Sequence, residues 1–212
     1  LLKTSALPIE ELAKKKLAAK IVSAFENGIL NGNGSGQPLG VFTASNDGVP
    51  ASRDVATTYT SSSSYMVADD LIRLKMSLRP AYRKNAKWCI GTDVLKDIML
   101  FKDQDGQYMW RPGLRDGDPD MLLGLPVYES EFAPVTKTST SYIAVLGDFS
   151  FYKFAYWTGI DIQVLVEKYA GKNQIGYLGH TLADGMPANA QAFARLKVGG
   201  SSTASTASPD AS

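Results

Sequence analysis

Cysteine and histidine are almost absent from this chain of 212 residues, which contains one of each. Because Cys89 is the only cysteine, no intrachain disulfide can form, and the single His180 excludes a histidine-rich metal site. No apolar run approaches the roughly 20 residues needed to span a bilayer, and no signal-peptide pattern opens the chain. We therefore expect a soluble protein from a reducing compartment, without a membrane partner.

An excess of charge of one sign is also lacking, because 22 Lys and Arg residues face 21 Asp and Glu residues. A protein that holds nucleic acid by neutralising phosphates normally carries a concentrated basic surface, so specific nucleic-acid binding is disfavoured. The chain is 44% hydrophobic and 20% charged, which is typical of globular proteins and predicts that most of it folds. Residues 199–212 are the exception: they contain no large apolar side chain and are predicted to be disordered.

The first 30 residues predict one long amphipathic helix from Pro8 to Leu30. Pro8 suits the first helical turn, and Asn31-Gly32 is a good C-terminal stop. The chain has no initiating Met and enters this helix almost at once, so we expect a cut or processed product. Apolar residues recur along the helix at intervals of four or five: Leu12, Leu17, Ile21, Phe25 and Ile29.

The rest of the chain predicts an irregular region, then a mixture of helices and strands. A helix is expected at 67–78 and another at 93–101 with Thr92 as its N-cap. Because the strands are not separated regularly by helices, the fold class is α+β. The segment "NQIGYLGHTLADG" fits helix or strand equally well. Strands are expected at "AKWCIGT", at "GLPVYES", three times within 142–166, and at "AQAFARLKV", whose alternation indicates a half-buried strand.

The stretch "NGNGSGQPLG", Asn31 to Gly40, has the glycine content of a phosphate-binding loop. Such a loop needs a strand before it and a helix after it, so that backbone N–H groups point toward the anion. Here a helix precedes the glycines, Pro38 follows them, and Gln37 occupies the place of the third glycine of GxGxxG. The stretch therefore predicts a helix-terminating turn in which Gly32, Gly34 and Gly36 supply permissive backbone angles.

Two acidic stretches, "DQDGQ" from Asp103 and "DGDPD" from Asp116, suggest calcium loops. A calcium loop of the helix-loop-helix kind needs a bidentate Glu at its twelfth position, where this chain has Leu114 and Val127. Both stretches are therefore interpreted as solvated turns. No metal and no cofactor is expected.

No residue pattern indicates catalysis, and we expect no enzyme activity. Cys89 lies in an apolar strand, where a small buried hydrophobe is expected, and His180 has no sequence partner that would make a triad. Lys14 to Lys16 are interpreted as a solvated helix face. The aromatic residues between Phe149 and Trp157 predict sheet core or a subunit interface.

The order of segments resembles the C-terminal two-thirds of tailed-bacteriophage major capsid proteins of the Hong Kong 97 type. The resemblance covers about residues 1 to 198. It rests on the long helix ending in "ENGILNGNGSGQPLGVF", then "NAKWCIGTDVLKDIMLFKDQDGQYMWRP", "LLGLPVYES" and "AVLGDFSFYKFAYWTGIDIQV".

The resemblance implies a division into parts and a function. Residues 1–35 would be the spine helix of a peripheral domain, 36–160 an axial domain, and 161–198 a return to the peripheral domain. Such proteins assemble with themselves into pentamers and hexamers of an icosahedral virion shell that encloses double-stranded DNA. Scaffold, portal and maturation protease are the implied partners, and host cytoplasm is the implied place of assembly.

Two departures from the family pattern limit what is carried over. The N-terminal arm and the extended loop that precede the spine helix in this family are absent from the given sequence. Some members crosslink neighbouring subunits through a Lys on that loop and an Asn assisted by a Glu seven residues later. Asn173 could match that Asn, but the later position is His180, so self-crosslinking is not expected.

Two alternatives to a phage shell remain from the sequence. One is an encapsulin shell, which shares the fold but encloses an enzyme cargo. The other is a soluble α+β enzyme or ligand-binding domain, for which the glycine stretch is the only feature.

Overall fold

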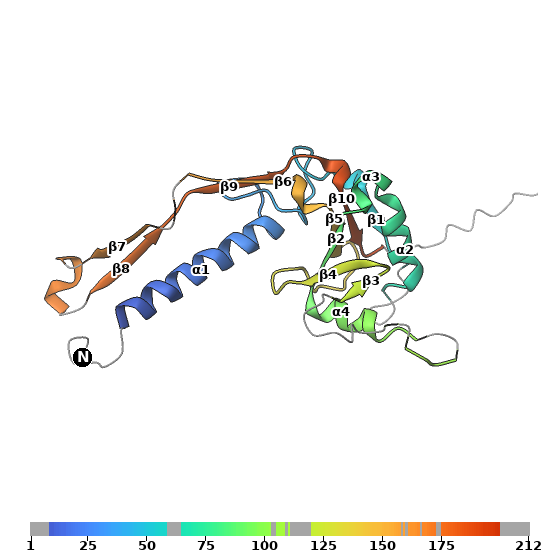
Figure 1. Cartoon of the computed structure of the whole chain (residues 1–212), viewed down its shortest axis with the longest axis horizontal. Helices are drawn as coiled ribbons and strands as arrows, with labels where there is room; N and C mark the ends of the chain where they lie inside the picture. The colour runs from blue at the N-terminus through green and yellow to red at the C-terminus, as the bar shows by residue number, and fades with distance from the viewer. Residues whose placement is uncertain are drawn as a thin grey trace, which may run out of the picture. The chain divides into compact units, whose positions relative to one another are not determined.

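The described residues of the computed structural model fall into two compact units (Figure 1). Unit 1 is formed by Leu1–Thr43 with Tyr152–Ala188, and unit 2 by Ala44–Phe151 with Asn189–Ser212. The structure describes residues 9–58, 65–102, 105–108, 110, 120–157, 159, 161–165, 167–172 and 175–199.

Unit 2 is built on a six-stranded mixed sheet. Its strand order is β1-β10-β5-β2-β4-β3, in which β1–β10 and β2–β4 are parallel pairs and the other neighbours are antiparallel. The predicted strands at 86–92 and 124–130 are confirmed as β2 and β4. The strands are β1 (Asp54–Ala56), β2 (Lys87–Ile90), β3 (Met121–Leu122), β4 (Leu125–Glu129), β5 (Tyr142–Gly147) and β10 (Phe193–Lys197).

Strand β10 is buried on both faces, so the predicted half-buried strand is wrong. It lies between β1 and β5, and both Phe193 and Arg195, predicted to alternate toward one side, are 0% exposed. The position of β10 also explains the boundary of unit 2. Since β10 pairs with β5 and β1 rather than with the strands just before it, unit 1 ends at Ala188 and the chain rejoins unit 2.

Arg195 is tolerated inside the sheet because the carboxylate of Asp54 compensates its positive charge. Its Nε donates to Asp54 Oδ1 at 2.7 Å and its Nη2 to the Pro50 carbonyl at 3.0 Å. The Tyr142 hydroxyl donates to Asp54 Oδ2 at 2.9 Å, and the Tyr142 ring lies under the guanidinium with its centroid 4.7 Å away. Burial and the hydrogen bond to Asp54 raise the pKa of Tyr142. The pair Arg195–Asp54 thus links β10 to β1 by side chains as well as backbone.

The helices of unit 2 supply apolar residues to one core. α2 (Ala68–Ser77) and α4 (Thr92–Met99) bury Leu71, Leu74, Val94 and Ile98. These side chains cluster with Trp88 of β2, whose indole N–H donates to the Leu122 carbonyl at 3.1 Å. Both helices were predicted from their apolar period. The short helices of the unit are α3 (Pro80–Arg83), η1 (Ala51–Arg53), η2 (Phe149–Phe151) and η4 (Ala190–Ala192).

One local prediction in unit 2 is corrected. The N-cap of α4 is Gly91, not Thr92, and it makes no side-chain cap. Thr92 instead donates its hydroxyl to Glu129 of β4. Pro80 opens α3, because a proline fits the first helical turn.

The long helix of unit 1, α1 (Ile9–Asn31), agrees with the prediction to within a residue at each end. The glycine stretch that follows is a turn, as expected, with Gly34 and Gly36 at φ +77° and +67°. Gly32 has a different role: an added Cβ would lie 2.0 Å from the Pro38 carbonyl oxygen. The chain folds back so closely that Val41 N–H donates to the Ile29 carbonyl at 3.0 Å.

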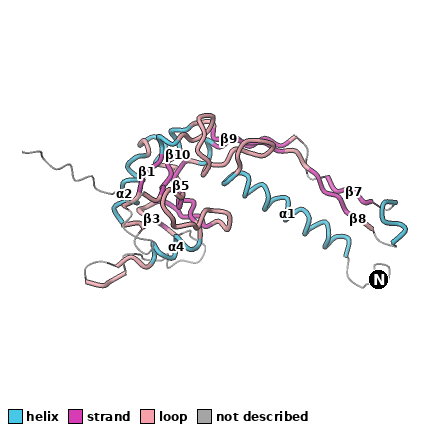
Figure 2. The backbone as a smooth tube through the Cα atoms, turned by 180° about the vertical axis from the view of Figure 1, so that it is seen from behind, coloured by secondary structure: helices cyan, strands magenta, loops and turns pink. Residues whose placement is uncertain are grey.

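The second part of unit 1 is a pair of two-stranded antiparallel ribbons. β6 (Tyr152–Tyr156) pairs with β9 (Ala183–Pro187), and β7 (Asp161–Leu165) pairs with β8 (Gly176–His180). The segment of ambiguous type therefore forms two strands, and η3 (Glu167–Lys172) lies between β7 and β8 in sequence. α1 runs beside β8 in both views (Figure 1, Figure 2), where Leu17 and Ile21 pack against Gly179.

We predict unequal costs for alanine at two glycines of the turn. Gly36→Ala should lower the melting temperature by about 2–4 °C, because the positive φ costs about 1 kcal/mol while the added Cβ meets nothing within 4 Å. Gly32→Ala should lower it by more than about 8 °C, because two backbone carbonyls must move. Thermal denaturation followed by circular dichroism measures both. Equal shifts would contradict the crowding argument.

We predict that Arg195→Met lowers the free energy of unfolding by about 3–5 kcal/mol, since it leaves Asp54 as an uncompensated buried charge. Arg73→Met is the comparison variant: Arg73 also pairs with a buried aspartate, but the Arg73 side chain is 54% exposed, and Asp70 still accepts hydrogen bonds from the backbone N–H groups of Thr58 and Val67. Urea unfolding should show a smaller loss for Arg73→Met, because two N–H donors continue to stabilise the Asp70 carboxylate. A small loss for Arg195→Met would refute the proposed role.

Candidate assembly surface

Two of the residues that the sequence singled out for chemistry, Cys89 and His180, lie in different units. Cys89 is buried in β2 at 7% exposure, as predicted. His180 lies in β8 with Nε2 3.6 Å from Asp161 Oδ2, and both side chains are more than half exposed. Asn173, most of the two acidic stretches and the 200–212 tail lie outside the described residues. Within the described parts of the chain, no group of three His, Cys, Asp or Glu side chains could hold a metal.

One cluster of ionisable groups in unit 2 does combine several elements. Asp97 of α4 accepts hydrogen bonds from the Tyr65 hydroxyl and from Lys137 Nζ. Burial by itself would raise the pKa of Asp97, but these two hydrogen bonds outweigh it and lower the pKa. Burial, and then the bond to Asp97, raises the pKa of Tyr65 far above its usual value. These two hydrogen bonds tie α4 to the segments that carry Tyr65 and Lys137.

The β6–β9 ribbon has one covered face. Phe154 meets Phe25 of α1 edge to face, with ring centroids 5.5 Å apart. The Tyr152 hydroxyl donates to the Leu39 carbonyl at 3.1 Å, and burial raises the pKa of Tyr152 to about 12. Gly185, paired with Phe154, is buried beneath these rings. α1 and the turn after it therefore cover this side of the ribbon.

The other face of the same ribbon is exposed. Side chains alternate along a strand, so the residues next to Tyr152 and Phe154 point to the opposite side. Trp157 is 86% exposed, Leu182 65% and Met186 45%. The backbone N–H of Trp157 donates to the Leu182 carbonyl at 2.9 Å, which places these two residues across from each other. We name Ala155, Trp157, Leu182 and Met186 the ribbon patch.

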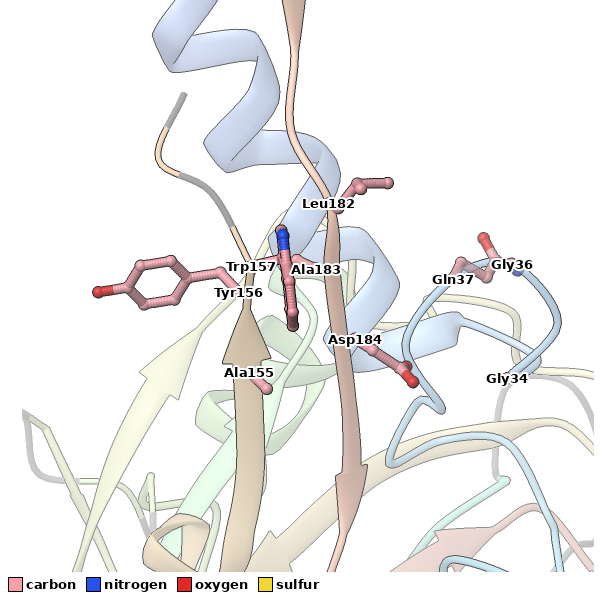
Figure 3. A pocket seen from close by; sticks show the side chains of 9 residues that line it. All are labelled: Gly34, Gly36, Gln37, Ala155, Tyr156, Trp157, Leu182, Ala183 and Asp184. Atoms are coloured by element: carbon pink, nitrogen blue, oxygen red, sulfur yellow. The ribbon is translucent and has the colours of Figure 1, made fainter. Parts of the chain in front are cut away.

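A hollow of about 440 Å³ adjoins the ribbon patch within unit 1. It lies between the ribbon and the glycine turn, and Gly34, Gly36 and Gln37 line its far side. Figure 3 shows Leu182 and Asp184 pointing from β9 to the side of that turn, while Tyr156 points away from it. The hollow combines an aromatic ring, aliphatic carbon and one carboxylate. Such a surface is suited to contact with a protein side chain.

The sequence found this surface only in part. The aromatic run was predicted to be sheet core or subunit interface, and core is wrong for its last residues: Tyr156 is 70% and Trp157 86% exposed. Leu182 and Met186 were missed because their segment fitted helix or strand equally well. The strand alternation shared by β6 and β9 is the signal that would have placed them on one face.

One known protein family is similar to this chain in sequence. The model of the phage capsid family matches residues 1–198. None of the curated proteins is significantly similar in sequence. No helix among the described residues is long and apolar enough to cross a membrane.

Several solved structures of shell proteins have the same fold. The capsids of the empty and the native GTA particle are 23% and 25% identical, with TM-scores of 0.79 and 0.77, over 94% of this chain and 69% of theirs. The holo encapsulin complex of Synechococcus elongatus is 13% identical with a TM-score of 0.65, over 93% of this chain and 69% of that one. From the family match and these folds, the chain belongs to the phage capsid family, has the Hong Kong 97-like fold and is a capsid shell protein.

Proposed function

We propose that this chain is the repeating subunit of an icosahedral phage or prophage head, assembled from pentamers and hexamers around packaged double-stranded DNA. The match of the phage capsid family over residues 1–198 carries the proposal. The even charge balance is compatible with a container that encloses DNA without gripping each phosphate. In this proposal the virion is the final location, and assembly in host cytoplasm precedes it.

We further propose that unit 1 is the peripheral domain and unit 2 the axial domain. The long α1 with its ribbons supports the first assignment, and the six-stranded sheet with α2 and α4 supports the second. The domains then divide at Thr43, Phe151 and Ala188 rather than at 35, 160 and 198. The protein has a structural role and no catalytic one, and scaffold, portal and maturation protease are its further partners.

An encapsulin shell is the second candidate, favoured by the structural likeness to the Synechococcus elongatus protein. The identity of 13% makes this the weaker alternative, since it supports the fold alone. The two candidates differ in what the shell contains, which is DNA in one case and an enzyme in the other.

We predict that the full-length natural polypeptide forms closed shells visible by electron microscopy, built from many individually weak contacts. Shells isolated from the natural source and treated with nuclease should retain double-stranded DNA, measured by absorbance at 260 nm after disruption. A retained enzyme in place of DNA would favour the encapsulin alternative. Monomers alone under every assembly condition would refute a shell role.

We also predict that the assembled shell contains no covalent links between copies. His180 occupies the position of the assisting Glu, and its side chain faces Asp161. On a denaturing gel, boiled shells should run as one band of single-chain mass. A ladder of multiples that resists boiling and reducing agent would contradict this prediction.

A further inference from the structure

The ribbon patch lies on a two-stranded element that α1 and the following turn cover on one face only. An isolated two-stranded ribbon is at best marginally stable in water, and a further layer stabilises it. The covered face of β6–β9 receives Phe25 and the turn at Leu39. The opposite face carries Trp157, Leu182 and Met186, which are exposed to solvent in this single chain. This face is the one where an added layer would bury the most apolar surface.

The area of this face fits the centre of an interface. An aromatic side chain buries about 150–250 Å² when covered, and Trp157 is 86% exposed. With Leu182 and Met186 the ribbon therefore offers a few hundred Å², the size that marks interaction surfaces on soluble chains. A stable interface needs about 800 Å² per partner, so polar surroundings must complete it. Trp and Tyr are also the residues that most often dominate binding energy.

The charges on this face favour a protein of the same composition as the occupant. Lys153 and Asp184 lie on the same side of the ribbon as Trp157, one positive and one negative. A nucleic acid would require a basic cluster, which this face does not have among its described residues. A second copy carries a formal net charge of only +1, so two copies approach without strong repulsion.

We propose that the ribbon patch is a docking surface for a second copy of this chain, with Trp157 as its anchor. The inference rests on the proposed shell function and assigns one contact of that shell to named residues. The hollow beside the patch, bordered by Gly34 and Gly36, receives a side chain of the neighbouring copy. Glycines suit the edge of this hollow because larger residues at positions 34 and 36 would place side chains in it.

The test compares three variants of the full-length polypeptide by the concentration at which half of it assembles, measured by light scattering and electron microscopy. Trp157→Glu should raise that concentration at least about tenfold, as expected for loss of an anchor residue. Trp157→Phe, which keeps an aromatic ring, should stay within about threefold. Val22→Glu is the matched control, since Val22 is a 57% exposed apolar residue of α1 in the same unit, and it should change the value less than about twofold.

A photo-crosslinking amino acid at position 157 identifies the occupant directly. Irradiated shells should give a denaturing-gel band of twice the single-chain mass, in which mass spectrometry finds a crosslink between two copies of this chain. A crosslink to nucleic acid or to another protein, or assembly of Trp157→Glu at the unaltered concentration, would overturn the docking inference while leaving the shell function standing. If the unaltered chain forms no shell at any concentration, both proposals fall together.

Discussion

The pairing of β10 with strands on both sides is the constraint on which the rest of the structure depends. β10 comes from the end of the described chain, yet it lies between β1 and β5 in the middle of the sheet of unit 2. Without it the sheet would separate into β1 on one side and β5 with its neighbours on the other. The buried ion pair of Arg195 with Asp54 fixes this insertion, because only one register brings the two charges together.

This constraint also determines the form of unit 1. The chain leaves the sheet after β5 and must return to enter β10 in the opposite direction, since the two strands are antiparallel. The segment between β5 and β10 leaves and re-enters the sheet at the same end of these two strands. It therefore satisfies its backbone N–H and C=O groups most simply by pairing with itself. The paired ribbons β6–β9 and β7–β8 follow from this. α1 covers one side of them, and a second exposed side is the consequence of a ribbon that is only two strands wide.

Sequence patterns predicted the elements whose signals are local. α1, α2, α4, β2 and β4 have clear apolar periods or caps, and these elements lie where expected. The prediction that β10 is half-buried was wrong because the residue that neutralises Arg195 is Asp54. Asp54 lies 141 residues away in the sequence, so no local pattern indicates the pair. Gly32 shows the same limit: its role is close approach to Pro38, which depends on how tightly the chain folds back.

The candidate assembly surface was half predictable for a related reason. The sequence identified Trp157 as interface or core, and only the pairing of β6 with β9 decides which face it occupies. The central place of β10 has one more consequence, which concerns timing during synthesis. The sheet of unit 2 cannot close until residues 193–197 have emerged from the ribosome, because its parallel partner β1 and its antiparallel partner β5 both pair with these residues. The ribbons of unit 1 are therefore synthesised, and can pair, before the sheet that holds β1 and β5 together is complete.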